Sequence, residues 1–407
     1  MDAITIENVD VVFGDKPEHA LALLDQGKTR QEIIDEAGQV VGVNKVSLSI
    51  KEGEICVLMG LSGSGKSSLL RAVNGLNSIS RGSLRIKDGD QQVDLAQCDE
   101  ATLRHLRTHR VSMVFQKFAL MPWLTVLDNV AFGLEMQGMA KKQRRKKAKE
   151  QLEMVGLSEW QDKYPHELSG GMQQRVGLAR AFAMDTDILL MDEPFSALDR
   201  MDEPFSALHP LIRAQLQDEL IQLQKKMNKT ILFVSHDLDE ALKIGNNIAI
   251  MESGCLIQHG APEEIVLSPE TDYVKDFVAH TNPLNVLKGR TLMLSKESLT
   301  QTDGAWQVCG RQDLWLEQSD QQMTLRNSDK RLLAWPCEQQ DPVVDDNVLL
   351  VASPDLDMRE MIALKKKNRQ PILLAEDDQF VGVLDTEHIY QALLGNYQSS
   401  ASANGLA

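Results

Sequence analysis

One glycine-rich segment constrains the fold of this chain more than any other. Residues 60–68 read GLSGSGKSS, which fits the pattern GxxxxGK[ST]. The apolar run ICVLM precedes the segment and the helical pattern SSLLRAVNG continues it, as this motif requires. Its glycines let backbone N–H groups turn around phosphate oxygens, and the helix N-terminus adds a favourable dipole. A glycine-rich turn without a ligand is the alternative, but the strand–loop–helix context favours a triphosphate site.

The side chains of this segment have predicted roles. The ammonium of Lys66 is expected to reach the β- and γ-phosphates, and the hydroxyl of Ser67 is expected to bind Mg²⁺. The residues that we expect at the nucleotide from this segment are Gly60, Ser62, Gly63, Ser64, Gly65, Lys66, Ser67 and Ser68.

Two acidic residues follow a second apolar strand. Asp192 ends the run ILLMD, where a carboxylate can hold Mg²⁺ through water, and Glu193 is placed to activate the attacking water. An acidic pair after a strand is a weak signal alone, because many strands end in acidic turns. Together with the glycine-rich segment it becomes a strong one.

A second anion-binding helix start is predicted at LSGGMQQR, residues 168–175. Gly170 and Gly171 precede a helical pattern, and Ser169 adds a hydroxyl donor. One chain does not need two phosphate-binding helix starts for one nucleotide. Two chains that face each other do need them, because each chain can complete the site of the other. The pattern therefore predicts a homodimer that shares its sites.

Strand patterns alternate with helical patterns along the chain, which predicts an α/β fold with a mostly parallel sheet covered by helices. A length of 407 residues exceeds what one core usually holds. We expect a first domain at 1–280 with a helical subdomain at about 117–175, a linker and degenerate region at 281–340, a small α/β module at 341–394 and a disordered tail at 395–407.

Composition excludes several classes of function. The formal net charge of −16 argues against nucleic acid as a partner, and we interpret the basic run at 141–149 as a solvated helix face. No apolar run approaches the roughly 20 residues that a membrane span needs. The N-terminus lacks the pattern of a secretory signal. Five cysteines without metal-binding spacing are expected to be reduced thiols of a cytoplasmic protein.

These motifs, in this order, resemble the ABC ATPase family over residues 4–280, which implies an ABC-type P-loop NTPase fold. The resemblance implies that Ser169, Gly170 and Gly171 close on ATP held by a partner subunit. It also implies that Phe13 stacks on adenine, that Gln116 contacts Mg²⁺ and the catalytic water, and that His236 contacts the γ-phosphate. Core packing is the alternative for Phe13, and a structural role is the alternative for His236.

An exact repeat interrupts the family pattern, because MDEPFSAL occurs at 191–198 and again at 201–208. Only the first copy follows an apolar strand, so we assign Asp192 and Glu193 to the catalytic pair and expect the second copy to loop out. The family's next motif, the D-loop, crosses the dimer interface. Its assignment is open between Asp199 and the segment Ser206–His209.

An insert at 14–41 and several motif-flanking segments resemble the ATPases of quaternary ammonium importers. That resemblance implies uptake of choline, glycine betaine or carnitine, with an integral membrane permease and a periplasmic or lipid-anchored solute-binding protein as partners. It places the chain at the cytoplasmic face of the inner membrane. Residues 341–394 resemble half of a CBS-type module, which implies either a sensor of ionic strength or a dimerisation surface.

Three alternatives to this function stay open. A soluble ABC ATPase of DNA repair or ribosomes usually carries paired cassettes or a long coiled coil, and this sequence has neither. A subunit that binds ATP but hydrolyses it weakly is consistent with the repeated MDEPFSAL segment. Within the importers, another osmolyte or amino acid is a possible solute.

Overall fold

The computed structural model describes residues 1–116, 119–195, 209–279, 281, 286–309, 313–319, 322–326, 328–335 and 347–393. The chain divides into two compact units, Met1–Ala279 and His280–Ala407. No helix among the described residues is both long and apolar enough to cross a membrane. The four cysteines in these ranges, Cys56, Cys98, Cys255 and Cys309, are free.

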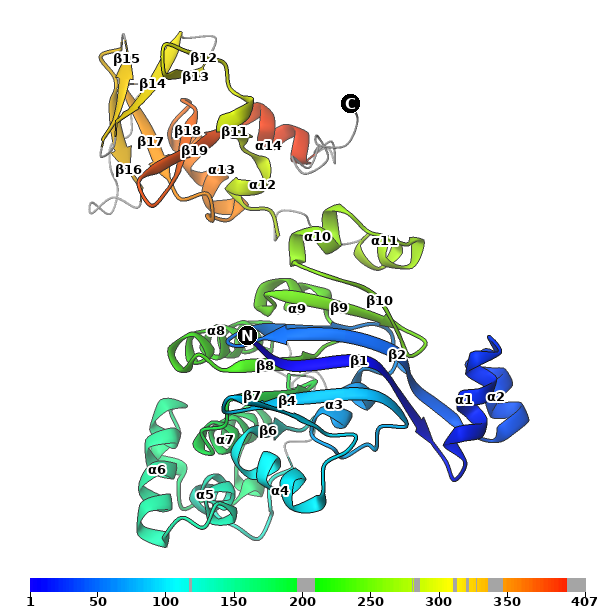
Figure 1. Ribbon diagram of the computed structural model, residues 1–407. Helices are drawn as coiled ribbons and strands as arrows, with labels where there is room; N and C mark the ends of the chain where they lie inside the picture. Colours follow the sequence, from blue (N-terminus) through cyan, green and yellow to red (C-terminus); the bar gives the residue numbers. More distant parts are fainter. Residues whose placement is uncertain are drawn as a thin grey trace. The chain divides into compact units, whose positions relative to one another are not determined.

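A six-stranded sheet forms the centre of the first unit (Figure 1). Its order is β10 (Cys255–Gly260), β9 (Asn247–Glu252), β3 (Ile55–Met59), β8 (Thr230–Val234), β7 (Ile188–Asp192) and β6 (Val111–Val114). All neighbours pair in parallel except β10 with β9. Every residue of β3, β7 and β8 is buried, as expected for strands covered on both faces. The predicted parallel sheet is confirmed.

A second, antiparallel sheet covers one side of the first unit. Its order is β2 (Val40–Lys51), β1 (Asp2–Phe13), β4 (Arg81–Asp88) and β5 (Gln91–Asp94). Helix α3 (Lys66–Val73) contacts strands of both sheets. Its apolar side chains join the largest core cluster, which includes residues of both sheets. The glycine-rich segment therefore lies at the start of a helix that is held between two sheets.

Three helices form a separate layer, α5 (Val126–Met136), α6 (Lys141–Met154) and α7 (Gly170–Ala183). Their apolar side chains make a core of their own, and the predicted helical character of this region is confirmed. Five further helices of the unit are α4 (Glu100–His109), α8 (His209–Met227), α9 (Leu238–Ile244), α10 (Pro262–Leu267) and α11 (Asp272–Val278), and two short 3-10 turns lie at Ser158–Trp160 and Pro165–Glu167.

Two short helices, α1 (Pro17–Asp25) and α2 (Arg30–Ala37), form the insert between β1 and β2 (Figure 1). A capping box starts α2, in which the Thr29 hydroxyl accepts from the Glu32 amide and the Glu32 carboxylate accepts from the Thr29 amide. Gly38 ends α2 with a φ of 64°, a left-handed conformation that glycine adopts without strain. The insert at 14–41 therefore contains two short helices.

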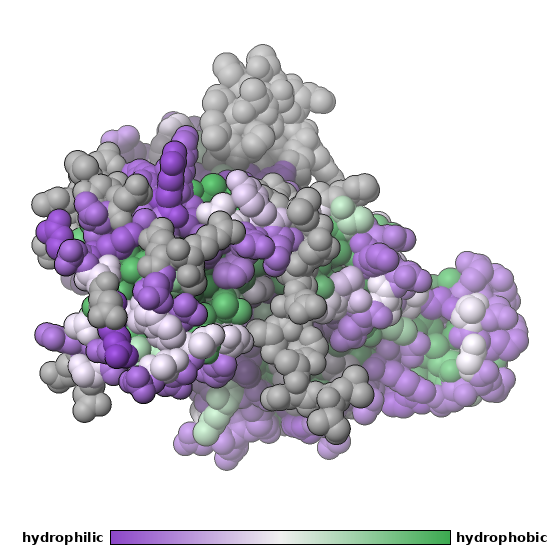
Figure 2. All heavy atoms as spheres, turned by 90° about the horizontal axis from the view of Figure 1, so that it is seen from above, coloured by the Kyte–Doolittle hydropathy of each residue, from purple (hydrophilic) through white to green (hydrophobic). Residues whose placement is uncertain are grey.

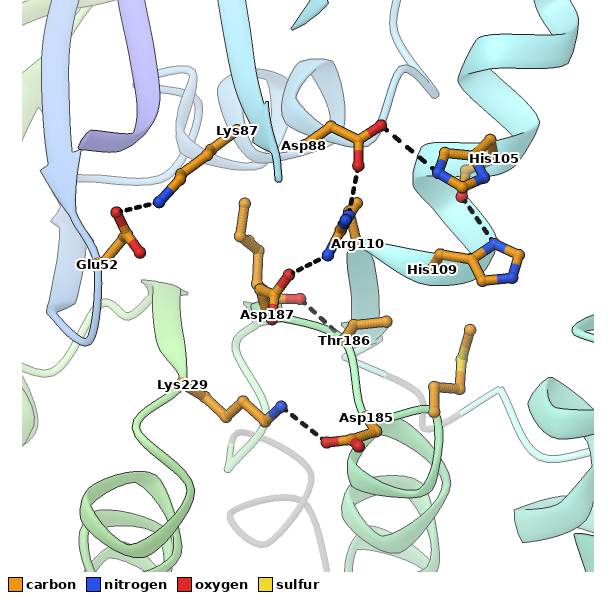
Figure 3. A network of polar contacts seen from close by, with 12 residues as sticks. Glu52, Lys87, Asp88, His105, His109, Arg110, Asp185, Thr186, Asp187 and Lys229 are labelled. Carbon is orange, nitrogen blue, oxygen red and sulfur yellow. Dashed lines mark hydrogen bonds and ion pairs between the residues drawn. The ribbon is translucent and has the colours of Figure 1, made fainter. Parts of the chain in front are cut away.

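An ion-pair network fastens the antiparallel sheet to the parallel one (Figure 3). Arg110, between α4 and β6, donates to Asp88 at the end of β4 over 2.6 Å and to Asp187 before β7 over 2.8 Å. The hydrogen bond to Asp88 is the main cause of a raised Arg110 pKa. His105 of α4 lies 3.5 Å from the same Asp88 carboxylate. The network thereby holds the segment just before β7, at Asp187, against the end of β4.

The range 281–340, expected to be a linker and degenerate region, contains several helices and strands. The described residues of that range form α12 (Gly289–Leu292), β11 (Leu294–Ser295), a 3-10 turn (Lys296–Ser298), β12 (Gln301–Thr302), β13 (Ala305–Cys309), β14 (Leu314–Ser319), β15 (Gln322–Arg326) and β16 (Arg331–Ala334). Strands β12 to β15 make a four-stranded antiparallel sheet. These strands are short and carry many polar residues, so their alternation was too weak to detect in the sequence.

The rest of the second unit consists of β17 (Val348–Ala352), α13 (Met358–Lys367), β18 (Ile372–Glu376), β19 (Gln379–Leu384) and α14 (Thr386–Leu393). Strands β18 and β19 pair in antiparallel fashion and α14 follows them, within the range 341–394 where a small α/β module was expected. These strands join β11 and β16 in a five-stranded sheet. A CBS-like character remains a prediction, and the tail at 395–407 lies outside the described residues.

The two sheets of the second unit share one core, which contains Leu316 of β14 and Phe380 of β19. Leu316→Ala should therefore lower the free energy of unfolding of this unit by about 2–5 kcal/mol. Calorimetry of the full chain should show the transition of the second unit at a lower temperature and that of the first unit unchanged. Leu294→Ala, at a side chain that is 39% exposed, is the matched control. An unchanged transition in Leu316→Ala would restore the linker interpretation.

Candidate nucleotide site

The glycine-rich loop fits against neighbouring backbone so closely that two of its glycines cannot be replaced without a clash. A Cβ on Gly60 would lie 2.1 Å from the Met251 carbonyl oxygen, and one on Gly65 would lie 2.3 Å from the Gly42 carbonyl oxygen. Both glycines have a positive φ, 138° and 103°. The sequence motif thus reflects the contacts of the loop with β9 and β2 as well as its turns.

Lys66 begins α3 and turns its side chain back into the loop. Its ammonium donates to the carbonyl oxygens of Gly60 at 2.7 Å and Leu61 at 3.0 Å. Burial lowers the pKa of Lys66, and the nearby carboxylates of Glu193 and Asp192 oppose that shift. The loop therefore contains a positive charge in a poorly hydrated position, where its attraction for phosphate is stronger than in water.

The second residue of α3, Ser67, is bound to the end of β7. Its hydroxyl donates to the Asp192 carboxylate at 2.8 Å, and Arg71, one turn further along α3, donates to the other oxygen of that carboxylate at 3.1 Å. Asp192 is only 3% exposed, so this pairing compensates for the cost of burying its charge. The two predicted Mg²⁺ ligands, Ser67 and Asp192, are in direct contact.

Glu193 brings together three of the predicted site residues, because it contacts both Gln116 and His236. Its carboxylate accepts from the Gln116 side-chain amide at 2.7 Å and lies 3.7 Å from Nδ1 of His236. Its backbone has a φ of 45°, a conformation that costs a non-glycine residue about 1–3 kcal/mol and is concentrated at functional sites. The Glu193 amide donates to the Val234 carbonyl at 3.1 Å, which fixes this turn to the end of β8.

A small hollow surrounds Glu193 and His236, and sequence reasoning missed several of its residues. It is lined by Glu193, Phe195, Arg213, Ser235, His236, Asp237 and Glu240. Glu240 of α9 is buried and accepts hydrogen bonds from Ser235 and from Gln217 of α8. Arg213 of α8 pairs with Asp237 at 3.1 Å. The acidic run DLDE after His236 is the only sequence signal for these residues that we find. Acidic residues are common at the start of any helix, so the run did not indicate a functional site.

Phe13 lies at the end of β1 and is 40% exposed. A Cβ on Gly42 would come within 2.6 Å of its ring and within 3.2 Å of the Ser68 side chain, so the ring and Ser68 of α3 both lie beside Gly42. This exposure argues against the core-packing alternative. An exposed aromatic ring beside the phosphate loop offers a face on which a base can stack.

Ser169 caps α7, the helix of the separate helical layer. Its hydroxyl accepts from the Met172 amide at 3.4 Å, and Gly170 and Gly171 form the first turn. Among the described residues, no hydrogen bond or ion pair joins these three residues to the loop at 60–68. The two predicted anion-binding helix starts are therefore separate features of one chain.

The repeated segment is only partly described. Met191 and Asp192 of the first copy lie on β7, and the ring of Phe195 packs against Phe233 of β8 with centroids 5.8 Å apart. Both D-loop candidates, Asp199 and the segment Ser206–His209, involve residues outside the described ones. The second copy at 201–208 lies there too.

Comparison with known proteins agrees with this geometry. A family model described as ABC transporter matches residues 43–196. The chain is 50% identical over 274 residues to the glycine betaine/proline betaine transport system ATP-binding protein ProV of Escherichia coli (strain K12), a match covering 67% of this chain and 65% of that protein. It is 48% identical over 297 residues to the glycine betaine/carnitine transport ATP-binding protein GbuA of Listeria monocytogenes serotype 1/2a (strain 10403S), covering 73% and 71%.

Among solved structures, a bacterial ABC transporter cassette in dimeric form superposes with a TM-score of 0.52 at 29% identity. That match covers 64% of this chain and 98% of the cassette. A post-hydrolysis dimer bound to ADP and Pi gives the same TM-score and identity.

The carboxyl of Glu240 should make stability depend on pH. Burial raises its pKa in the folded state, so the folded chain holds the proton more tightly than the unfolded chain does. The resulting stability is present below the unfolded pKa and is lost as pH rises through the folded pKa. Urea unfolding should show that wild type loses stability relative to Glu240→Gln as pH rises above the ordinary pKa of a glutamate carboxyl, about 4.3. The exposed Glu159→Gln variant is the control, and parallel pH profiles of wild type and Glu240→Gln would contradict the prediction.

Proposed function

Because this chain belongs to the ABC transporter family of ATP-binding subunits, we propose that it hydrolyses ATP to drive the import of a quaternary ammonium solute. The observation that carries the proposal is the Glu193 carboxylate, held by Gln116 at 2.7 Å and 3.7 Å from His236. It follows directly on Asp192, which is bonded to Ser67 of the phosphate loop. The proposed base Glu193 and its partners Gln116 and His236 therefore lie beside the phosphate loop, at one edge of the parallel sheet.

The residues divide the chemistry among them. Lys66 and the loop amides bind the β- and γ-phosphates and neutralise charge that develops on them. Glu193 accepts the proton of the attacking water, Gln116 orients the Glu193 carboxylate, and His236 positions the γ-phosphate. The Ser67 hydroxyl and the Asp192 carboxylate, 2.8 Å apart, are hard oxygen ligands that fit Mg²⁺ together with Gln116. Bound Mg²⁺ would supply further positive charge at the phosphate oxygens.

A homodimer completes the site in this proposal. Ser169, Gly170 and Gly171 begin a helix in a layer apart from the phosphate loop, and a helix start with free amides attracts a phosphate. The proposed occupant is the γ-phosphate of ATP on the partner subunit. Dimer closure on ATP and reopening after hydrolysis would then drive the conformational cycle of a membrane permease.

The solute class follows from the relatives. Two of them are named for transport of glycine betaine with proline betaine or carnitine, and others for trimethylamine N-oxide. Choline, glycine betaine and carnitine are the proposed solutes. A permease and a periplasmic or lipid-anchored solute-binding protein are the proposed partners. The proposed location is the cytoplasmic face of the inner membrane.

The repeat of MDEPFSAL at 191–198 and 201–208 supports a second candidate function. Ten additional residues between β7 and α8 would alter a segment that the family uses at the dimer interface. Weak hydrolysis combined with normal ATP binding would then make the chain a regulatory subunit. The rate of ATP hydrolysis with the reconstituted permease distinguishes this candidate from an active motor.

Glu193→Gln should leave ATP binding within about twofold of wild type and lower kcat by at least about 100-fold, because it removes the base and keeps the shape. Phosphate release and binding of a fluorescent ATP analogue measure the two effects. Glu159→Gln, at an exposed carboxylate of the helical layer, should leave both unchanged. Phosphate release at the wild-type rate from Glu193→Gln would refute the assignment.

Uptake assays test the solute class. Cells that lack this gene should lose uptake of radiolabelled glycine betaine or choline, and wild type but not Glu193→Gln should restore it. The solute with the larger loss is the substrate. Unchanged uptake of both, with loss of another osmolyte or amino acid, would favour a different importer.

A further inference from the structure

The two-helix insert at 14–41 contacts the phosphate loop directly. Arg30, the first residue of α2, donates from Nη1 to the Gly63 carbonyl oxygen at 2.9 Å. Gly63 has a φ of 80°, and its carbonyl lies in the middle of the loop. A charged donor therefore holds one of the peptide groups that shape the phosphate site.

Apolar packing holds the insert against the antiparallel sheet. Its own buried side chains form a cluster with residues that flank them on β1 and β2; the members are Val12, Ala20, Leu23, Ile33 and Val41. The two ends of the insert are also joined, because the Lys16 amide donates to the Gln39 side chain at 3.2 Å. Figure 2 shows the insert, at the right, mostly hydrophilic on the face in view. The insert is a packed unit attached to the sheet.

Ionic contacts provide a second attachment. Asp25, at the end of α1, lies 3.1 Å from the Lys45 ammonium and 2.8 Å from the Arg81 guanidinium. Arg81 also pairs at 2.6 Å with the fully buried Asp10 of β1. The Arg81 contact is the main cause of a lowered Asp25 pKa. These pairs connect the insert to β1, β2 and β4.

The helix cap of α2 then sets the position of Arg30. Thr29 precedes it and makes the capping box with Glu32, which fixes the backbone at the start of the helix. The buried side chain of Ile33 packs α2 into the apolar cluster of the insert. The backbone of Arg30 therefore has a fixed position from which its guanidinium reaches the loop. This backbone is ordered before the contact forms, and only the side chain of Arg30 remains to be ordered when it holds the loop.

The turn between β9 and β10 makes a matching contact with the loop. The Gly254 amide, between β9 and β10, donates to the Ser64 carbonyl oxygen at 2.9 Å, and the Gly254 carbonyl accepts from the Asn44 amide at 2.8 Å. Consecutive loop carbonyls, of Gly63 and Ser64, thus accept from donors outside the loop. The Ser64 amide, which belongs to the same peptide group as the Gly63 carbonyl, donates to the Leu61 carbonyl oxygen at 3.1 Å. Contacts within the loop and from outside it therefore fix the backbone of this turn together.

We propose that the insert is a clamp on the phosphate loop and that Arg30 is a positioning residue for nucleotide binding. The proposal rests on the proposed function, since it assumes that the loop binds ATP. Arg30 acts through the Gly63 peptide and does not touch the reacting atoms. Loss of the contact weakens ATP binding while the step performed by Glu193 stays as it is. The insert thereby raises the affinity of the site for nucleotide.

The test compares Arg30→Ala, Arg30→Lys and a neighbouring control in the full-length chain. Gln31→Ala alters the next residue of the same helix, whose side chain donates to Asp35 at 3.0 Å away from the loop. Titration with a trinitrophenyl derivative of ATP gives Kd, and phosphate release gives KM and kcat. Circular dichroism shows whether each variant is folded.

Arg30→Ala should raise Kd and KM together by about three- to tenfold, the loss expected for one charge-assisted hydrogen bond to a partly exposed loop, with kcat within about twofold. Arg30→Lys should recover part of the affinity, and Gln31→Ala should match wild type. Equal Kd for wild type and Arg30→Ala, or a loss confined to kcat, would overturn the clamp alone. Failure of the wild-type chain to bind ATP would overturn the proposed function and the clamp with it.

Discussion

The hydrogen bond between Ser67 and Asp192 is the interaction on which the rest of the site depends. It joins the helix that follows the phosphate loop to the end of β7 at 2.8 Å, across 125 residues of sequence. Because α3 packs between two sheets, its first turn is supported beside the ends of β7 and β8. Glu193 follows Asp192 directly, and the ends of β7 and β8 therefore hold the proposed base and His236 beside the phosphate loop.

The sequence was sufficient for this central part because its motifs contain their own context. Gly60 directly follows β3 and Asp192 ends β7; both strands are fully buried, and parallel strands end at a common edge. Glu240 and Arg213 could not be found in the same way. They lie on polar helices that look like surface helices in sequence, and their burial arises from the packing of α8 against α9.

The second unit shows a different limit. Strands β12 to β15 contain between two and six residues, too few for periodicity to exceed chance. Leu316 is fully buried only because the antiparallel sheet folds onto β18 and β19. Long-range pairing of this kind leaves little trace in a local pattern, so the sequence indicated only a linker and degenerate region here. In the insert, by contrast, the local residues Thr29 and Gly38 mark the start and end of α2.

Two attachments at the phosphate loop, Arg30 to Gly63 and Gly254 to Ser64, complement the proposed contact from a partner subunit at Ser169. The central claim is that ATP is held by the loop of one chain and the Ser169 helix start of another. Sedimentation velocity of the Glu193→Gln chain with Mg²⁺ and either ATP or ADP tests it most directly. The account predicts that the Glu193→Gln chain is a dimer with ATP. The same chain with the second substitution Ser169→Arg should be a monomer with ATP. A chain that stays monomeric with saturating ATP, or a dimer indifferent to Ser169→Arg, would contradict it.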